Sequence, residues 1–287
     1  MSKQDRQGVR LASDLERKYR FGKSFADQTK TSARLEKQIS ANEAENNAAM
    51  ARESSVRIFM DNVAVHHAAD HTVIRVYRDK TDGMKQFPFV YAPNGAGSGQ
   101  QSTLDMNRSA GWMLAINAGV FDAACVPLGI VIQNGVVIQN ASSTNKPLTI
   151  DVDGNLGYAN SDADAAALAA NGIVSAVCGF APLVIDYSLT QSADYPSADN
   201  WSASAARQII GQFGNGDYAV ITGEAWTLDE AQAVCKELGL KFAYNLDGGS
   251  STETVLGQKH MNTIYENETG RVVPTYLVFN GADYFNV

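Results

Sequence analysis

Short runs of apolar and β-branched residues recur from residue 56 to the end of the chain, and glycine or polar residues separate them. Runs of this length with such boundaries are typical of strands. Asn134-Gly135 lies between two of the runs and predicts a hairpin with a two-residue turn. The predicted strands are Thr72–Tyr77, Phe87–Tyr91, Trp112–Asn117, Gly129–Gln133, Val136–Gln139, Leu148–Val152, Ile173–Cys178, Leu183–Tyr187, Gln208–Gln212, Tyr218–Thr222, Phe242–Leu246 and Pro274–Asn280.

Three segments favour helices instead, namely Thr103–Gly111, Asp162–Asn171 and Leu228–Leu238. The last follows Thr227, a suitable N-cap, and Glu230 occupies the third helical position, so the two residues predict a capping box. Many strands with few helices predict an α+β fold with mixed or antiparallel sheets.

The N-terminal part of the chain has a different character. Between Ser13 and about Ser55 there is no proline, glycine is confined to Gly22, and helix formers dominate. The apolar positions are too sparse to form a core, so a lone helix here would gain little from packing. We therefore expect residues 1–57 to be a helical, coiled-coil-like segment that assembles with copies of itself or stays partly disordered. The folded domain is expected at residues 58–287.

Charge divides at the same place. Residues 1–57 contain 12 Lys and Arg against 8 Asp and Glu, whereas the rest of the chain contains 11 against 23. An acidic body argues against nucleic acid as a partner, because phosphate contacts need Lys and Arg. No long apolar span or signal-peptide pattern is present, so we expect neither membrane insertion nor a secretory leader.

The cysteines and histidines give no metal signature. Cys125, Cys178 and Cys235 are widely spaced in apolar surroundings, which predicts small core residues rather than a zinc site or a disulfide framework. His66, His67 and His71 are close in sequence, but the strand pattern that begins at Thr72 argues against a shared helical face, so no metal is expected.

Two further segments have alternative interpretations. The run from Asp151 to Asn155 resembles the start of a calcium loop but lacks the glutamate at its twelfth position, which favours a hairpin turn. Trp201 could stack on a sugar ring or anchor its loop by partial burial.

The run Tyr244-Asn245-Leu246-Asp247-Gly248-Gly249-Ser250-Ser251-Thr252 carries the strongest chemical signal. A lone acid, two glycines and three hydroxyls after an apolar strand place polar groups at one tight turn. Glycine lets a ligand approach the main chain, and the amides and hydroxyls can hold an anion. Taken alone, the run is also compatible with an ordinary Asx/Gly turn.

Four more segments precede this turn in a fixed order. They are Ala115-Ile116-Asn117-Ala118-Gly119-Val120-Phe121-Asp122, Pro127-Leu128-Gly129-Ile130-Val131-Ile132-Gln133-Asn134-Gly135, Cys178-Gly179-Phe180-Ala181-Pro182-Leu183-Val184, and Ala206-Arg207-Gln208-Ile209-Ile210-Gly211. Together with the stretch from Trp226 to Ser251, this ordered set resembles the phosphodiester glycosidase family over about residues 58–287.

The resemblance implies hydrolysis of a sugar 1-phosphodiester, without a cofactor or metal. An arginine and the turn amides would neutralise the phosphate, and a carboxylate would act at the cation-like sugar carbon as nucleophile, base or electrostatic stabiliser. The implied catalytic residues are Asp247, Asp122 and Asn117. The implied substrate-binding residues are Arg207, Asn245, Gly119, Gly248, Gly249, Ser250 and Glu224.

One segment departs from the family pattern. Where relatives usually have Asp-Gly-Arg after a strand, this chain has Thr222-Gly223-Glu224, which replaces a cation by an acid. The exchange predicts an altered substrate preference or a loss of catalysis.

A second, shorter resemblance covers about 20 residues. Asp5-Arg6-Gln7-Gly8-Val9-Arg10 and Asp14-Leu15-Glu16-Arg17-Lys18-Tyr19 are similar to the leader of tail proteins from phages of Gram-positive bacteria. This likeness implies a homotrimeric virion protein that contacts other tail proteins through residues 1–57 and acts on a host cell-surface glycopolymer such as teichoic acid or capsule. The alternative is a receptor-binding tail module that recognises the same polymer without cleaving it.

Overall fold

The computed structural model describes residues 63–79, 86–93, 100–195, 201–262 and 270–279. All of them belong to the second of the two units into which the chain divides, Val56–Val287. The helical segment predicted at residues 1–57 lies outside the described residues. Within the described part, no helix is long and apolar enough to cross a membrane.

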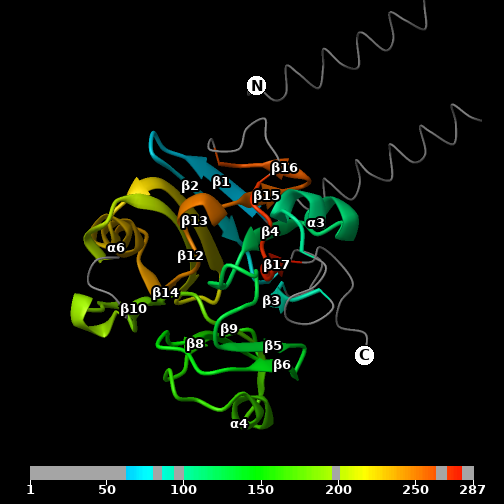
Figure 1. The fold of residues 1–287 in the computed structure, drawn as a ribbon. Coiled ribbons are helices and arrows are strands. Elements are labelled where there is room, and N and C mark those ends of the chain that lie inside the picture. The colour runs from blue at the N-terminus through cyan, green and yellow to red at the C-terminus, as the bar shows by residue number, and fades with distance from the viewer. Residues whose placement is uncertain (1–62, 80–85, 94–99, 196–200, 263–269, 280–287) are drawn as a thin grey trace, which may run out of the picture. The chain divides into compact units, whose positions relative to one another are not determined.

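Three sheets form the domain (Figure 1). The first has seven strands in the spatial order β1 (Val63–His67), β2 (His71–Val76), β13 (Tyr218–Trp226), β12 (Ala205–Phe213), β14 (Leu240–Asn245), β10 (Ala181–Ile185) and β11 (Ser188–Leu189). The second has the order β16 (Lys259–His260), β15 (Thr254–Leu256), β4 (Leu114–Asn117), β17 (Tyr276–Phe279) and β3 (Pro88–Tyr91). The third has the order β6 (Val136–Asn140), β5 (Ile130–Gln133), β9 (Ile173–Val177), β7 (Leu148–Asp151) and β8 (Leu156–Tyr158).

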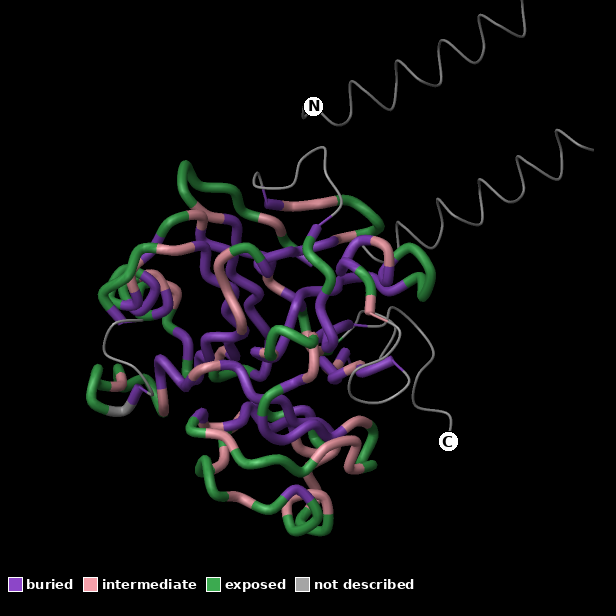
Figure 2. Tube along the Cα trace, viewed as in Figure 1, coloured by how far each residue is buried: buried purple, intermediate pink, exposed green. Residues whose placement is uncertain are grey.

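Each sheet packs one face against a shared core and the other against a helix. The shared core takes residues from all three sheets, including Ile74, Ile116 and Ile150. On the outer faces lie α6 (Leu228–Glu237) over the first sheet, α3 (Thr103–Ala110) over the second and α4 (Ala165–Ala170) over the third (Figure 1). Figure 2 shows the result as buried residues along the central strands and exposed residues at the outer turns. Two short 3₁₀ turns complete the elements, η1 (Ser192–Asp194) and η2 (Gly249–Ser251).

The α+β class is confirmed, and every strand pairing among the described residues is antiparallel. Each predicted strand overlaps an observed one. Asn134 and Gly135 both have positive φ in the predicted two-residue hairpin, and the Thr227–Glu230 capping box is present. The α4 helix is shorter than predicted because the Asp164 side chain accepts a hydrogen bond from the Ala167 amide and so starts the helix at Ala165.

Side-chain hydrogen bonds distinguish between the alternatives that the sequence left open for the Asp151 segment and for Trp201. Asp151 Oδ1 accepts hydrogen bonds from the amides of Asp153 and Asn155, so this segment is a structural turn between β7 and β8. Trp201 is buried and donates from its indole nitrogen to Asp229, which makes it a loop anchor. Cys178 and Cys235 are buried free thiols, and Cys125 is a half-buried one.

Candidate functional site

The Asp247 turn is fixed by backbone bonds to two different sheets. The Leu246 amide donates to the carbonyl of Gln208 in β12 at 2.9 Å, and the Asp247 amide donates to the carbonyl of Ala118, just beyond β4, also at 2.9 Å. Asn117 adds a side-chain bond, since its Nδ2 donates to the Asp247 carbonyl at 2.8 Å. The turn therefore lies where the ends of the first and second sheets meet.

The two glycines of the turn serve different purposes. A Cβ on Gly248 would lie 2.6 Å from the carbonyl oxygen of Ala206, so only glycine lets the turn lie this close to β12. Gly249 has φ +60°, and a Cβ there would have no atom within 4 Å. The space beside Gly249 is thus open, and its role in substrate binding stays a prediction.

Asp247 is a half-buried carboxyl in this turn. Burial raises its pKa from 3.8 to about 6. Hydrogen bonds from the Ser251 hydroxyl and the Gly248 amide act in the opposite direction and lower the pKa, as does the charge of Arg271. A carboxyl that titrates near neutrality can exchange protons or attack as an anion at ordinary pH, which is what acid–base and nucleophilic catalysis require.

Arg271 supplies the positive charge beside the Asp247 turn, and it is not among the residues predicted from the sequence. Its Nη1 lies 3.3 Å from Ser250 Oγ and 3.2 Å from Ser251 Oγ, and its guanidinium stacks on the Phe121 ring at 4.7 Å from the centroid. The side chain is exposed, so it can reach a bound anion as well as the two hydroxyls. No motif surrounds it. Its position just before a predicted strand, which in the structure is β17 (Tyr276–Phe279) and pairs with β4 so that Tyr276 lies opposite Asn117, was the one available signal.

Asn117 and Gly119 are predicted site residues that hold the architecture together. Asn117 is buried, and its Oδ1 accepts from the Glu253 amide at 3.0 Å while its Nδ2 holds the turn. Gly119 donates to Thr275 Oγ1 at 2.9 Å, and a Cβ there would lie 2.6 Å from the Val177 side chain. Asn117 therefore positions the Asp247 turn, and Gly119 joins the segment after β4 to Thr275. The catalytic role predicted for Asn117 and the substrate-binding role predicted for Gly119 stay predictions.

Arg207 and Asn245 lie on the face of the first sheet that packs against α6. Arg207 is buried, with Nε donating to the Trp226 carbonyl at 2.9 Å and a terminal nitrogen donating to the carbonyl of Ala203. Asn245 Nδ2 donates to the Tyr195 hydroxyl at 2.5 Å. Their sequence-predicted role in substrate binding stays a prediction.

Asp122 lies on an exposed loop after β4. Its Oδ1 accepts hydrogen bonds from the amides of Ala124 and Val126, both at 2.9 Å, so this carboxylate closes its own turn. The neighbouring Phe121 contacts Arg271, which places the loop next to the Asp247 turn.

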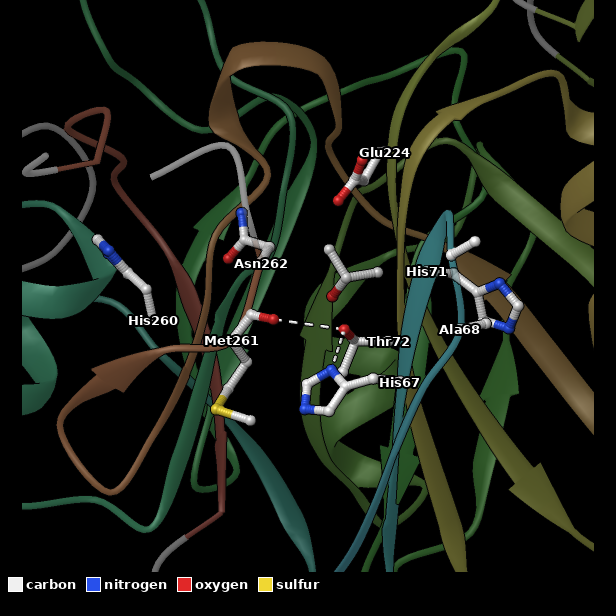
Figure 3. Close-up of a pocket in the computed structure, with 10 residues that line it drawn as sticks. His67, Ala68, His71, Thr72, Glu224, His260, Met261 and Asn262 are labelled. Atoms are coloured by element: carbon white, nitrogen blue, oxygen red, sulfur yellow. Dashed lines mark hydrogen bonds between the residues drawn. The ribbon is translucent and has the colours of Figure 1, made fainter. Parts of the chain in front are cut away.

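Glu224 lies in a pocket of about 240 Å³ farther along the same sheet edge (Figure 3). Figure 3 shows Thr72 and Glu224 on one wall and Met261 and Asn262 on the other. Thr222, which pairs with Thr72 across β13 and β2, also lines the pocket. The remaining lining residues are His67, Ala68, Ala69, His71 and His260. We call this cavity the Glu224 pocket.

A row of paired strands connects the Glu224 pocket with the Asp247 turn. Thr72 pairs with Thr222, and Thr222 pairs with Gln208, whose carbonyl binds the Leu246 amide. Side chains continue the connection, because Thr222 Oγ1 lies 2.6 Å from Thr254 Oγ1, which donates to Gln208 Oε1 at 3.0 Å. The two sites are therefore parts of one polar sheet edge.

Among the described residues, no group of three His, Cys, Asp or Glu side chains could hold a metal ion. His67 and His71 instead bond to neighbours, with His67 Nδ1 3.0 Å from Thr72 Oγ1 and His71 Nδ1 2.8 Å from Asp70 Oδ1.

The antiparallel α+β domain thus brings together a carboxyl of raised pKa, a Gly-Gly-Ser turn and an adjacent arginine, which are groups that can act on an anionic ligand. Residues 110–280 match the model of the phosphodiester glycosidase family, and the chain belongs to that family. No curated protein sequence matches the chain.

Two solved structures share the fold. One is the catalytic domain of zebrafish N-acetylglucosamine-1-phosphodiester α-N-acetylglucosaminidase, auto-inhibited by its pro-peptide, with 18% identity and a TM-score of 0.60, covering 76% of this chain and 82% of that one. The other is a hypothetical protein from Synechocystis, with 14% identity and a TM-score of 0.60, covering 76% of this chain and 61% of that one. The family membership supports hydrolysis of phosphodiester-linked sugars as the general activity.

Proposed function

We propose that this protein hydrolyses sugar 1-phosphodiesters at the Asp247 turn. The observation that carries the proposal is the meeting of a carboxyl of raised pKa with the Arg271 guanidinium across the Ser251 hydroxyl. A phosphodiester needs a cation and hydrogen-bond donors for its oxygens, and its sugar carbon needs a carboxylate as bond breaking leaves positive charge there. The Asp247 turn supplies the carboxylate and the hydrogen-bond donors, and the adjacent Arg271 supplies the cation.

In the proposed reaction Asp247 acts in its ionised form, which the Ser251 hydroxyl, the Gly248 amide and Arg271 all favour. It attacks the sugar C1 or activates the water that does so. The bond between C1 and the phosphate oxygen breaks, water supplies the new hydroxyl on C1, and the phosphate leaves as a monoester on the other partner. Arg271 and the amide at Gly249 stabilise the charge on the departing phosphate.

Free sugar released from a panel of sugar 1-phosphodiesters tests the proposal. We expect release by the wild type and a loss of at least ~10² in kcat with Asp247→Asn, the range expected when an acid–base group is removed. Asp153→Asn serves as the matched control, because Asp153 is an exposed residue in the turn between β7 and β8 and has no predicted role at the site. Equal rates for wild type and Asp247→Asn would contradict the assignment.

For the biological setting, we propose that a phage tail delivers this hydrolase to a host cell-surface glycopolymer such as teichoic acid or capsule. The leader-like motifs within residues 1–20 support this setting, as does the acidic charge of the rest of the chain, which disfavours nucleic acid. Purified cell-wall and capsular polymers of Gram-positive hosts, assayed for released sugar, provide the test.

The alternative is a tail module that binds the glycopolymer without cleaving it. Two points favour it: the family resemblance predicts an arginine where this chain has Glu224, and the Asp122 carboxylate is engaged by its own loop rather than by the Asp247 turn. Saturable binding of the polymer with no release of sugar would decide for this alternative.

A further inference from the structure

We propose that Glu253 is a positioning residue whose buried carboxylate holds the Asp247 turn in place for hydrolysis. The inference rests on the proposed function, because it adds a residue to the same site. Glu253 is only 1% exposed, less than Arg207 and Asp217, the other two buried Asp, Glu, Lys or Arg residues in the described part of the chain. A charge buried to this degree is costly unless it is fully paired, and the proposed reaction makes no use of it. Its partners therefore indicate what it does.

Both oxygens of the Glu253 carboxylate accept hydrogen bonds. Oε2 accepts from the Thr103 amide at 2.7 Å and Oε1 from the Leu104 amide at 3.2 Å, and these are the first two residues of α3. Oε1 also lies 2.5 Å from Nε2 of His260, at the end of β16. The first amides of a helix have no partner within the helix and attract a negative charge. The start of α3 and the His260 ring thus hold the Glu253 side chain from two sides.

A chain of hydrogen bonds leads from Glu253 to the Asp247 turn through Asn117. The Glu253 amide donates to Asn117 Oδ1 at 3.0 Å, and Asn117 Nδ2 donates to the Asp247 carbonyl at 2.8 Å. Because both ends of the Asn117 side-chain amide are bonded, this side chain follows the main chain of Glu253. The carboxylate fixes that main chain by tying it to α3. A movement of Glu253 therefore displaces the Asp247 turn.

The carboxylate also packs against the residue that precedes Arg271. Gly270 is buried, and a Cβ there would lie 2.2 Å from Glu253 Cδ. Only glycine lets the main chain approach the carboxylate so closely. The main chain of Arg271 begins at this contact, and its guanidinium reaches the hydroxyls of Ser250 and Ser251. Glu253 is thus connected to both segments that the proposed function needs, the one with the catalytic carboxylate and the one with the cation.

His260 offers a second way to disturb the Glu253 carboxylate. Figure 3 shows its ring turned away from Thr72 and Glu224, although the residue lines the Glu224 pocket. The side chain is 6% exposed, and its Nε2 meets Glu253 in the interior. Removing the ring would leave both bonds between the carboxylate and α3 in place, so the disturbance should be milder than a change of Glu253 itself.

The titration of Asp247, followed by carboxyl NMR on the full-length protein, tests the inference without any need for hydrolysis. Burial is the largest influence on this carboxyl and raises its pKa to about 6. Glu253→Gln keeps the side-chain shape but places an amide where an oxygen accepted hydrogen bonds. The turn should then loosen, and the Asp247 pKa should fall toward 3.8. Asp217→Asn is the matched control, because it changes another buried, hydrogen-bonded acid, in the hairpin turn at the far end of β12, and should leave the Asp247 pKa unchanged.

Variants of His260 separate positioning from a direct effect of charge. His260→Ala removes a partner of Glu253 but keeps the Glu253 charge, so a displaced turn should again lower the Asp247 pKa. A purely electrostatic influence of Glu253 would not lower it in this variant. His260→Gln should restore the wild-type value, because a glutamine amide can donate in place of Nε2. An Asp247 pKa that stays at its wild-type value in Glu253→Gln, or that falls in this variant alone, overturns the inference. If Glu253→Gln does not fold, the two His260 variants decide.

Sugar release separates this inference from the proposed function. We expect Glu253→Gln to lower kcat by about tenfold to a hundredfold and to change KM by less than about threefold, because a misplaced reacting group slows the chemical step. Asp217→Asn should keep the wild-type kcat when both proteins are assayed well below their melting temperatures. If the wild type releases no sugar but the Asp247 titration responds as expected, the proposed function alone is rejected. If it releases sugar and neither kcat nor the titration responds to Glu253→Gln, the positioning role alone is rejected.

Discussion

Asp247 is held between two opposing influences, burial that favours its neutral form and three nearby groups that favour its ionised form. Its raised pKa means that the folded protein keeps an ionised carboxylate at neutral pH at a cost in stability. A side chain retained at such a cost is typical of functional sites. Activity that depends on the ionised form should therefore rise as the pH increases through about 6.

Asp247→Asn should stabilise the protein at neutral pH while abolishing hydrolysis. The wild-type carboxyl titrates at 3.8 in the unfolded chain and about 6 in the folded one, so stability falls as the pH rises between those values. The variant does not titrate there. We expect the two proteins to be equally stable near pH 4. Above pH 7 the variant should be more stable by about 1–2 kcal/mol, because solvent screening of the half-buried carboxyl reduces the roughly 3 kcal/mol that the full shift would give. Urea denaturation across this range measures the difference, and a less stable variant at pH 7.5 would contradict the raised pKa.

Arg271→Ala should weaken binding of a sugar 1-phosphodiester by about tenfold or more, as expected when a hydrogen bond to a charged group is lost. Binding of the free sugar should change little, because the guanidinium faces the anion. Calorimetry with both ligands makes the comparison. Arg108→Ala, an exposed charge at the end of α3, controls for net charge.

Arg207→Ala provides the contrasting variant, since Arg207 is the arginine that the sequence predicted for the phosphate. Its buried bonds to the carbonyls of Trp226 and Ala203 predict a lower melting temperature. If Arg207→Ala lowers affinity for the charged ligand and Arg271→Ala does not, the phosphate role returns to Arg207.

The difference between these two arginines shows what sequence could reveal at the residue scale. The Asp247 turn was predictable because its acid, glycines and hydroxyls are contiguous, so one local pattern contains them. Arg271 joins that turn from a distant segment through Ser250, Ser251 and Phe121, and such a contact depends on strand pairing that local patterns do not encode.

At the scale of elements, the edge of the first sheet brings the site together. β12, β13 and β14 are antiparallel neighbours, so the start of β12 lies beside the ends of the other two. Their hydrophobic runs predicted all three strands. The short β15 and β16 were missed, because Thr254–Leu256 and Lys259–His260 contain too few alternating apolar residues to form a pattern. Yet these two strands lead into Met261 and Asn262, which form one wall of the Glu224 pocket.

The glycine pair that joins β14 to η2 gives a prediction at this scale. Gly248→Ala should destabilise the protein by about 1–3 kcal/mol, because its Cβ would meet a backbone carbonyl of β12 that cannot move independently. Gly249→Ala introduces only left-handed strain, worth about 1 kcal/mol, but places a methyl group where the ligand approaches. We therefore expect Gly248→Ala to lower the free energy of unfolding more. Gly249→Ala should lower the rate of sugar release by more than its small loss of stability can explain. Urea denaturation and sugar release on both variants would show whether this order holds.

At the scale of the whole domain, three helix-covered sheets share a single core, and this arrangement fixes the sheet ends that form the site. Sequence patterns predicted the α+β class and its strands, but not that the strands would divide into three sheets. Strand order depends on contacts between residues far apart in the chain, such as those of β2 with β13, and hydrophobic periodicity contains no information on partners. The resemblance to the phosphodiester glycosidase family came from the ordered motifs, because hydrophobic periodicity does not identify a family.

The last prediction concerns residues 1–57, which lie outside the described residues. We expect them to assemble the full-length chain, most simply as a trimer, because a long polar helix with few apolar positions gains stability mainly by packing against copies of itself. A truncated protein that begins at residue 58 should be a monomer that retains hydrolysis, since every residue placed at the Asp247 turn and the Glu224 pocket lies beyond that point. Light scattering on both proteins, with sugar release measured on each, provides the test. Two results would contradict this prediction: a monomeric full-length chain, or a truncated protein whose oligomeric state is unchanged. Either result would mean that the N-terminal segment does not assemble the chain, and it would remove one argument for a phage tail assembly.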